Sequence, residues 1–233
     1  MGPFLSIIIP TYNSFSTIES CLNSVRDQIF LDYEVIVVDG LSEDETITFV
    51  KARASADPKI KLFSDKDYGI YDAMNKGIEY ARGKWLYFLG SDDSLFDHRV
   101  LFDFASIANK ISAPVIYGNV KIVGQTAWSS DGAIYDGKFD LKKLLTKNIC
   151  HQAIFYKADF IRAIRYNIKY SICADWDFNM KCWSKGKFIY MNRVIANFHG
   201  GGASTNNSRD VSFEEEIEQN IIQYFGVNKS KKK

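Results

Sequence analysis

The feature that most constrains the fold is a unit that occurs repeatedly in the first half of the chain. An apolar run of strand length leads into a polar loop and then into a helical spacing of apolar residues. The apolar runs are residues 5–9, 34–38, 60–63 and 84–89. Because these runs are apolar on both faces, they indicate a mainly parallel sheet covered by helices on both sides. The sequence therefore predicts an α/β fold.

The pattern changes after Ala113-Pro114, where strands and helices no longer alternate regularly. Mixed strand directions are expected in this part. The predicted segments are strands at 115–123, 152–156 and 187–198, helices at 157–164, 175–185 and 213–225, and a flexible loop at 200–204.

Length and composition favour one domain in a reducing compartment. A chain of 233 residues can bury one substantial core, and no repeat or linker divides it. The formal net charge of +1 gives no reason to expect nucleic acid as a partner. The four cysteines form no CxxC pair, and the N-terminus lacks a signal-peptide pattern. No apolar run approaches the roughly 20 residues of a membrane span. We expect a cytoplasmic protein.

Two adjacent carboxylates, Asp92 and Asp93, follow the fourth apolar run almost directly. Ligands of open α/β sheets collect at the carboxyl ends of strands, and paired carboxylates there are costly unless a cation offsets their repulsion. Oxygen ligands of this kind suit Mg²⁺ or Mn²⁺ held jointly with substrate phosphates. The same Ser-Asp-Asp-Ser sequence is also good helix-capping chemistry, and the residues alone leave both interpretations open.

Polar side chains also follow the first two runs. Thr11, Tyr12, Asn13 and Asp39 form a hydrogen-bonding set with one carboxylate, which would suit a nucleoside. Ordinary loop polarity is the alternative for Thr11 and Asn13. The chain has neither GxGxxG opening its first helix nor GxxxxGK[ST], which argues against a dinucleotide dehydrogenase or a P-loop ATPase.

A third polar group lies at the start of the helix that follows residues 60–63. Asp72, Asn75 and Lys76 lie within about one turn of each other and could reach a ribose or a diphosphate, since helix starts receive phosphate. The alternative is that Asp65 or Asp67 simply caps this helix.

Downstream, Asp175 and Asp177 fall in the first turn of a predicted helix beside Trp176. Helix polarity alone would explain acids there. In a cleft wall, however, partial desolvation raises the pKa of a carboxylate toward that of a useful general base. His199 ends the last strand, where a lone histidine is more often structural than a ligand.

Taken together, these motifs resemble the bacterial family 2 glycosyltransferases with the GT-A fold, whose core is a Rossmann-like, mainly parallel sheet. The resemblance covers about residues 5–204, and its string from Gly69 to Gly77 is similar to enzymes that build O-antigen, capsule and other exopolysaccharides. The motifs that carry it are residues 6–13, 34–42, 67–77, 88–93, 151–152 and 174–177.

The resemblance implies a role for each motif. The chain would divide into a nucleotide-binding half (1–112), a smaller, mixed-strand acceptor-binding half (113–210) and a C-terminal helix with a basic tail (211–233). Asp175 would be the general base, and Asp93 and His199 would bind Mn²⁺ or Mg²⁺. The donor contacts would be Pro10, Thr11, Tyr12, Asn13 and Asp39 at the base, Asp92 at the ribose, Gln152 at the sugar, and Asp72, Asn75 and Lys76 nearby.

Two positions depart from the commoner pattern. Gly90 stands where a first acid often precedes the Asp pair, and Ala174 stands where a Glu often precedes the base. The first departure leaves Asp93 as the metal anchor, and the second removes a possible acceptor contact.

The implied reaction is a single displacement with inversion, from a nucleotide-sugar donor, a UDP-sugar or alternatively a GDP- or dTDP-sugar, to a glycan or lipid-linked oligosaccharide. A metal-dependent sugar nucleotidyltransferase and a non-catalytic nucleotide-sugar binding module are the alternatives. The first usually has a Gly-rich basic loop after its first strand, which residues 10–14 lack.

The tail raises the question of membrane contact. Apolar residues between 213 and 225 fall near helical spacing, and four lysines follow from Lys229. A basic amphipathic helix can lie on an anionic membrane face. The alternative is a helix packed on the core, favoured by the acidic residues at 214–216 and 218, which would repel such lipids.

Overall fold

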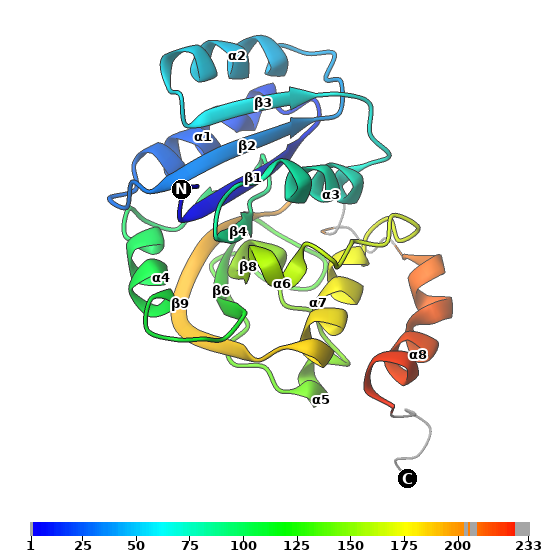
Figure 1. The fold of residues 1–233 in the computed structure, drawn as a ribbon. Coiled ribbons are helices and arrows are strands. Elements are labelled where there is room, and N and C mark those ends of the chain that lie inside the picture. Colours follow the sequence, from blue (N-terminus) through cyan, green and yellow to red (C-terminus); the bar gives the residue numbers. More distant parts are fainter. Residues whose placement is uncertain (1, 203–204, 206–208, 227–233) are drawn as a thin grey trace.

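The computed structural model describes residues 2–202, 205 and 209–226. Its first half alternates strands and helices as predicted (Figure 1). These elements are β1 (Leu5–Thr11), α1 (Phe15–Arg26), β2 (Tyr33–Asp39), α2 (Thr46–Ala56), β3 (Ile60–Ser64), α3 (Ile70–Tyr80) and β4 (Trp85–Phe88). Every residue of β1, β2 and β4 is buried, whereas β3 is partly exposed because it forms the sheet edge. The predicted α/β fold is confirmed.

The order of these strands places a crevice between β1 and β4. The sheet runs β3-β2-β1-β4 with all neighbours parallel. The chain moves outward from β1 to β3 and then returns past β1 to β4. Right-handed crossovers therefore put α1 and α2 on one face and α3 on the other. The order reverses between β1 and β4, and ligands of such sheets bind outside the carboxyl ends of the strands at this reversal.

The second half continues the same sheet with mixed strand directions, as expected. Its order after β4 is β8-β6-β9-β5, and β8 is antiparallel to both neighbours while β6 and β9 are parallel. The elements are β5 (Ser94–Leu95), α4 (Val100–Ala108), β6 (Val115–Val123), β7 (Ile134–Tyr135), α5 (Leu141–Leu144), η1 (His151–Ala153), β8 (Ile154–Lys157), α6 (Ala158–Ile161), α7 (Ala174–Lys185), β9 (Phe188–His199) and α8 (Val211–Phe225).

Two predicted boundaries in this half are wrong. Gln152 does not begin a strand but lies in the 3₁₀ turn η1, because its side chain is bound to Asp93 and its carbonyl oxygen accepts from Tyr87. The helix predicted over 157–164 is only the four residues of α6, and strand β8 extends to Lys157.

The C-terminal helix α8 packs beside α7 (Figure 1). Phe213 and Ile221 on its apolar face are buried, so this part of the face serves the core. Asp210 caps the helix by accepting from the Phe213 N–H. The lysine tail lies outside the described residues, and membrane contact through it stays a prediction. Of the helices in the described ranges, none combines the length and apolar character needed to span a bilayer.

Candidate active site

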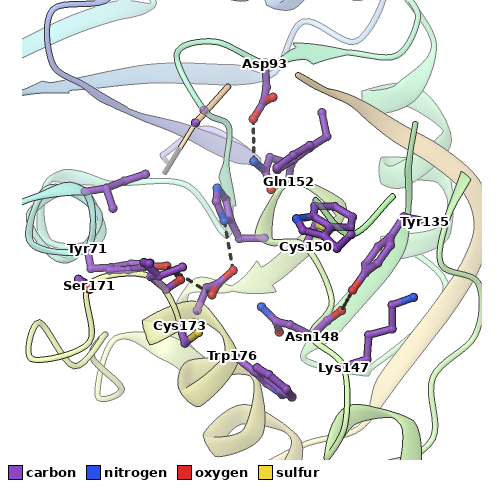
Figure 2. A pocket seen from close by; sticks show the side chains of 18 of the residues that line it. Tyr71, Asp93, Tyr135, Lys147, Asn148, Cys150, Gln152, Ser171, Cys173 and Trp176 are labelled. Carbon is purple, nitrogen blue, oxygen red and sulfur yellow. Dashed lines mark hydrogen bonds and ion pairs between the residues drawn. The ribbon is translucent and has the colours of Figure 1, made fainter. Parts of the chain in front are cut away.

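The carboxyl end of β4 opens into a cavity of about 540 Å³, named here the central cavity. Its lining contains five of the side chains that the sequence singled out, which come from the turn after β4 and from η1, α7 and β9. Figure 2 shows Asp93 and Gln152 at one end of this cavity and Trp176 at the other. The predicted residues on the lining are Asp92, Asp93, Gln152, Asp175 and His199.

Asp93 is more deeply buried than the other two carboxylates on this lining, Asp92 and Asp175, with only 2% of its surface exposed. Its Oδ2 accepts from Gln152 Nε2 at 2.7 Å, and its Oδ1 accepts from the His199 N–H at 2.8 Å. Burial, and after it the negative charge of Asp92, raise the pKa of Asp93 to about 7. The neutral hydrogen bonds therefore do not compensate the buried charge, which would be stabilised by a cation.

The residues around Asp93 fit a divalent cation. A Cβ at Gly90 would lie 2.5 Å from Asp93 Oδ2 and 2.8 Å from Asp92 Oδ1, so both carboxylates converge over a position that only glycine leaves open. The Nδ1 atom of His199 lies 4.0 Å from Asp93 Oδ1 and is buried without a hydrogen-bond partner. Carboxylate oxygens are ligands that suit Mn²⁺ or Mg²⁺.

These residues do not form a complete metal cage. Within the described ranges, no three His, Cys, Asp or Glu side chains are gathered closely enough to hold a metal ion. A divalent ion at Asp93 would therefore need further oxygen ligands from a bound phosphate, which is typical of Mg²⁺ sites.

Asp175 lies in the first turn of α7 and faces the central cavity with its side chain 14% exposed. Its Oδ2 is 3.5 Å from His151 Nδ1, and its Oδ1 is 3.4 Å from the Tyr71 hydroxyl, which donates to the Ile172 carbonyl oxygen. Burial, and then the charge of Asp175, raise the pKa of Tyr71 well above its usual value. The phenol therefore stays protonated beside the carboxylate.

Asp177 points the other way, into the contact between α7 and α8. It is fully buried, accepts from the Tyr224 hydroxyl at 2.9 Å and from Asn220 Nδ2 at 3.3 Å, and pairs with Lys181 at 2.6 Å. Asp175 and Asp177 thus share a helical turn, but only Asp175 reaches the cavity.

This arrangement predicts that Asp177→Ala is a stability variant. Removing one partner of a buried, hydrogen-bonded ion pair leaves the others unpaired and costs about 3–5 kcal/mol. We expect the free energy of unfolding, measured by urea denaturation, to fall by that amount. Asp159→Ala is a matched control, because Asp159 is also an acid in a first helical turn but is exposed. Equal stability of the two variants would contradict the burial argument.

A second cavity, of about 550 Å³, lies at the carboxyl end of β1 and is named here the β1 cavity. Pro10, Thr11 and Tyr12 line it, together with Lys66 and Asp67. Tyr12 is 60% exposed, so its ring is available to a ligand. Ile70 lines both cavities, which therefore adjoin at the start of α3. A ligand longer than one cavity could occupy both.

Asn13 and Asp39 flank the β1 cavity without lining it. The Asn13 N–H donates to Ser42 Oγ, and its Oδ1 accepts from the Glu43 N–H, so it ties two loops together. Asp39 is fully buried and accepts from the Ser42 N–H, the Ser42 hydroxyl and the Ser64 hydroxyl. Both shape the loops at this edge, and direct contact with a ligand stays a prediction.

Asp72, Asn75 and Lys76 line neither cavity. Asn75 donates to the Tyr166 carbonyl oxygen and accepts from its N–H, while Lys76 pairs with Asp72 at 3.5 Å. The Asp72 carboxylate also accepts from the Tyr68 N–H. Their expected contacts with a ribose or diphosphate stay predictions, and the structure gives these side chains other partners. Neither Asp65 nor Asp67 caps the helix, whose N-cap is Gly69.

Several cavity residues were not predicted as site residues. His151 stands next to the predicted Gln152, and its Nε2 atom is buried without a hydrogen-bond partner. Tyr71 adjoins the predicted Asp72. The sequence signals for His151 and Tyr71 were the motifs that contain their neighbours Gln152 and Asp72. No sequence motif marks three further lining residues. These are Trp128 in a loop, Tyr135 in the short strand β7 and Lys147 in the segment after α5.

Comparison with known families and proteins gives consistent matches. The family described as "Glycosyl transferase family 2" matches residues 6–169. A "PGL/p-HBAD biosynthesis glycosyltransferase" of Mycobacterium tuberculosis is 40% identical over 218 residues, covering 91% of this chain and 83% of that protein. A chondroitin synthase of Pasteurella multocida is 28% identical over 214 residues, covering 88% of this chain and 22% of that protein.

Solved structures share the fold at lower identity. S. aureus TarS aligns with a TM-score of 0.77 and 20% identity, over 97% of this chain and 66% of that chain. A TarS structure in complex with UDP-GlcNAc aligns with a TM-score of 0.75 and 17% identity, over 99% of this chain and 74% of that chain. A mannosyltransferase of Pyrobaculum calidifontis in complex with GDP-Man and Mn²⁺ aligns with a TM-score of 0.66 and 18% identity, over 97% of this chain and 64% of that chain.

Proposed function

This chain belongs to glycosyl transferase family 2, and we propose that it is an inverting, metal-dependent enzyme. It moves a sugar from a nucleotide-sugar to a glycan or lipid-linked acceptor in bacterial surface polysaccharide synthesis. The donor we propose first is a UDP-sugar. The observation that carries this proposal is that Asp93 and Asp175, from the first and second halves of the chain, line one cavity. The Asp93 carboxylate suits the binding of a cation, and the Asp175 carboxylate suits the role of proton acceptor.

The donor fits the two adjoining cavities. The base would lie against Tyr12 in the β1 cavity, Asp92 would receive the ribose, and Gln152 would face the sugar in the central cavity. Asp93 and His199 would hold Mn²⁺ or Mg²⁺, which when bound neutralises charge on the departing diphosphate. The UDP-GlcNAc complex of TarS and the GDP-Man and Mn²⁺ complex of the mannosyltransferase support this assignment by analogy of fold.

Asp175 would act as the general base. It would accept the proton of an acceptor hydroxyl as the hydroxyl oxygen attacks the anomeric carbon and the bond to the diphosphate breaks. This displacement inverts the anomeric carbon and needs no covalent intermediate. Tyr71 and His151 hold the carboxylate from two sides, which supports an oriented base.

The contact with His151 predicts a positioning role. In His151→Ala, Asp175 loses one of its two neighbours, and a misplaced base costs up to about 10²-fold in rate. We expect kcat to fall by about 10- to 100-fold while the affinity for UDP, measured by calorimetry, stays unchanged. His151→Asn restores a polar group and should recover part of the rate. An unchanged kcat in His151→Ala would remove His151 from the mechanism.

The proposed function is tested with a panel of UDP-, GDP- and dTDP-sugars in the presence of MnCl₂ or MgCl₂. The readout is release of nucleoside diphosphate, with and without a lipid-diphosphate oligosaccharide acceptor. Acceptor-stimulated release from one donor is the expected result. Release of inorganic pyrophosphate from a nucleoside triphosphate and a sugar phosphate would instead indicate a nucleotidyltransferase. Donor binding without any turnover would indicate a binding module.

A further inference from the structure

Part of the lining of the central cavity is an aromatic surface that the roles assigned above do not use. We define this aromatic wall as Trp128, Tyr135, Trp176 and Phe198. Trp128 is 40% exposed, with its ring centroid 5.0 Å from that of Tyr135 and 5.5 Å from that of Phe198. Two neighbouring rings therefore brace an indole that still presents surface to the cavity.

The polar ends of two wall residues are already bound to the main chain. The Tyr135 hydroxyl donates to the Asn148 carbonyl oxygen at 2.8 Å, as Figure 2 shows, and Trp176 Nε1 donates to the Leu144 carbonyl oxygen at 2.7 Å. These hydrogen bonds fix the orientation of the rings. The wall is thus a pre-oriented surface, and such surfaces bind with little loss of conformational freedom.

The basic side chains on the lining are paired with carboxylates. Lys147 lies 2.7 Å from Asp136 Oδ2 and 4.3 Å from the centroid of the Tyr135 ring. Arg209 is ion-paired with Glu214. Each Lys and Arg on the described part of the lining thus has a carboxylate partner, although Lys147 shares Asp136 with Lys143, which lies 3.3 Å from the same oxygen. Asp175 would repel an anionic ligand. The wall favours a neutral ligand.

Hydroxyl and amide side chains accompany the aromatic rings. Ser171 and Asn148 line the same cavity, and the Asn148 Oδ1 accepts from Asn179 Nδ2 at 2.8 Å, which fixes the amide. A pyranose ring combines an apolar face of C–H groups with hydroxyls at its rim. Apolar cavities with a few placed polar groups are typical of binding sites for such small molecules.

We propose that the aromatic wall is the acceptor subsite and that it takes a neutral pyranose, which stacks on Trp128 and directs a hydroxyl toward Asp175. This inference rests on the proposed function, because it assigns the acceptor of that reaction. Uronic acids and other anionic sugars are disfavoured at this position in the acceptor, and a phenolic ring is the competing source of a flat neutral ligand.

The test measures binding of methyl glycopyranosides by saturation-transfer NMR, with diamagnetic MgCl₂ and the nucleoside diphosphate that the donor panel selects. The neutral arm contains gluco-, galacto- and manno-configured methyl pyranosides, the acidic arm methyl glucuronide, and the aromatic arm phenol. We expect a neutral pyranoside to bind the wild type and to outcompete both other arms. Trp128→Ala should weaken this binding by about tenfold or more, whereas Trp128→Phe, which keeps a ring, should retain most of it.

Phe102→Ala is the matched control, since Phe102 is an aromatic residue with 43% exposure on α4, outside the central cavity. It should bind pyranosides like the wild type. Nucleoside diphosphate affinity should be the same in all variants. Loss of pyranoside binding with that affinity intact supports the subsite, whereas failure of the wild type to bind any nucleoside diphosphate would overturn the proposed function itself. Tighter binding of glucuronide or phenol, unchanged binding in Trp128→Ala, or no pyranoside binding to the wild type would overturn the subsite.

Discussion

Asp93→Asn is expected to reduce sugar transfer by about 10³-fold or more, because the contribution of a Lewis acid to such a step is several kcal/mol. Asparagine keeps the volume of the side chain and one carbonyl oxygen, but it removes the charge that would hold a divalent ion. The measurement is release of nucleoside diphosphate over a MnCl₂ titration. Wild-type activity should be abolished by EDTA and restored by added metal.

Asparagine is the better test than alanine at this position. Alanine would leave the Gln152 amide and the His199 N–H without an acceptor, and each unpaired buried donor costs about 1–3 kcal/mol. Asp131→Asn is a matched control, because Asp131 also accepts from a main-chain N–H, that of Gly124, but is exposed. Full activity of Asp93→Asn in EDTA would refute the assignment of the metal to Asp93.

Asp175→Asn should lower kcat by roughly 10²- to 10⁴-fold and leave donor affinity nearly unchanged. The amide has almost the shape of the carboxylate but does not take up the proton of the attacking sugar hydroxyl. The measurement combines steady-state kinetics with calorimetric titration of the nucleoside diphosphate. Asp177→Asn should be much milder in rate, because Asp177 faces α8 and not the cavity. If the two effects are reversed in size, the base is the wrong carboxylate.

The sequence was sufficient to predict the strand ends. Strands β1, β2 and β4 are largely apolar and fully buried, so the polar residues that end them or follow them had to lie at the carboxyl edge of the sheet. Asp93 was therefore predictable from the run that precedes it. The hydrogen-bond donors to its two oxygens were not predictable, because Gln152 and His199 come from elements far along the chain.

Helix α3 illustrates the limit of sequence spacing. The motif identified the helix, but adjacent helical residues differ in direction by about 100°. Tyr71 points into the central cavity, whereas Asp72 next to it pairs with Lys76. The aromatic wall was harder still, since Tyr135 reaches the cavity only through the two-residue pairing of β7 with β6. Such short pairings leave almost no periodic pattern in a sequence.

The contacts of α8 also bear on how the protein is made. Asp210 accepts from the N–H groups of Ile172 and Cys173, directly before the turn that carries Asp175, and Tyr224 donates to Asp177 just after it. Both ends of α8 therefore brace the start of α7. On the ribosome, β1 to β4 emerge long before these partners do. A nascent chain that has released α7 but still holds α8 in the exit tunnel would have β1 to β4 available for pairing while the turn that carries Asp175 lacks its supports.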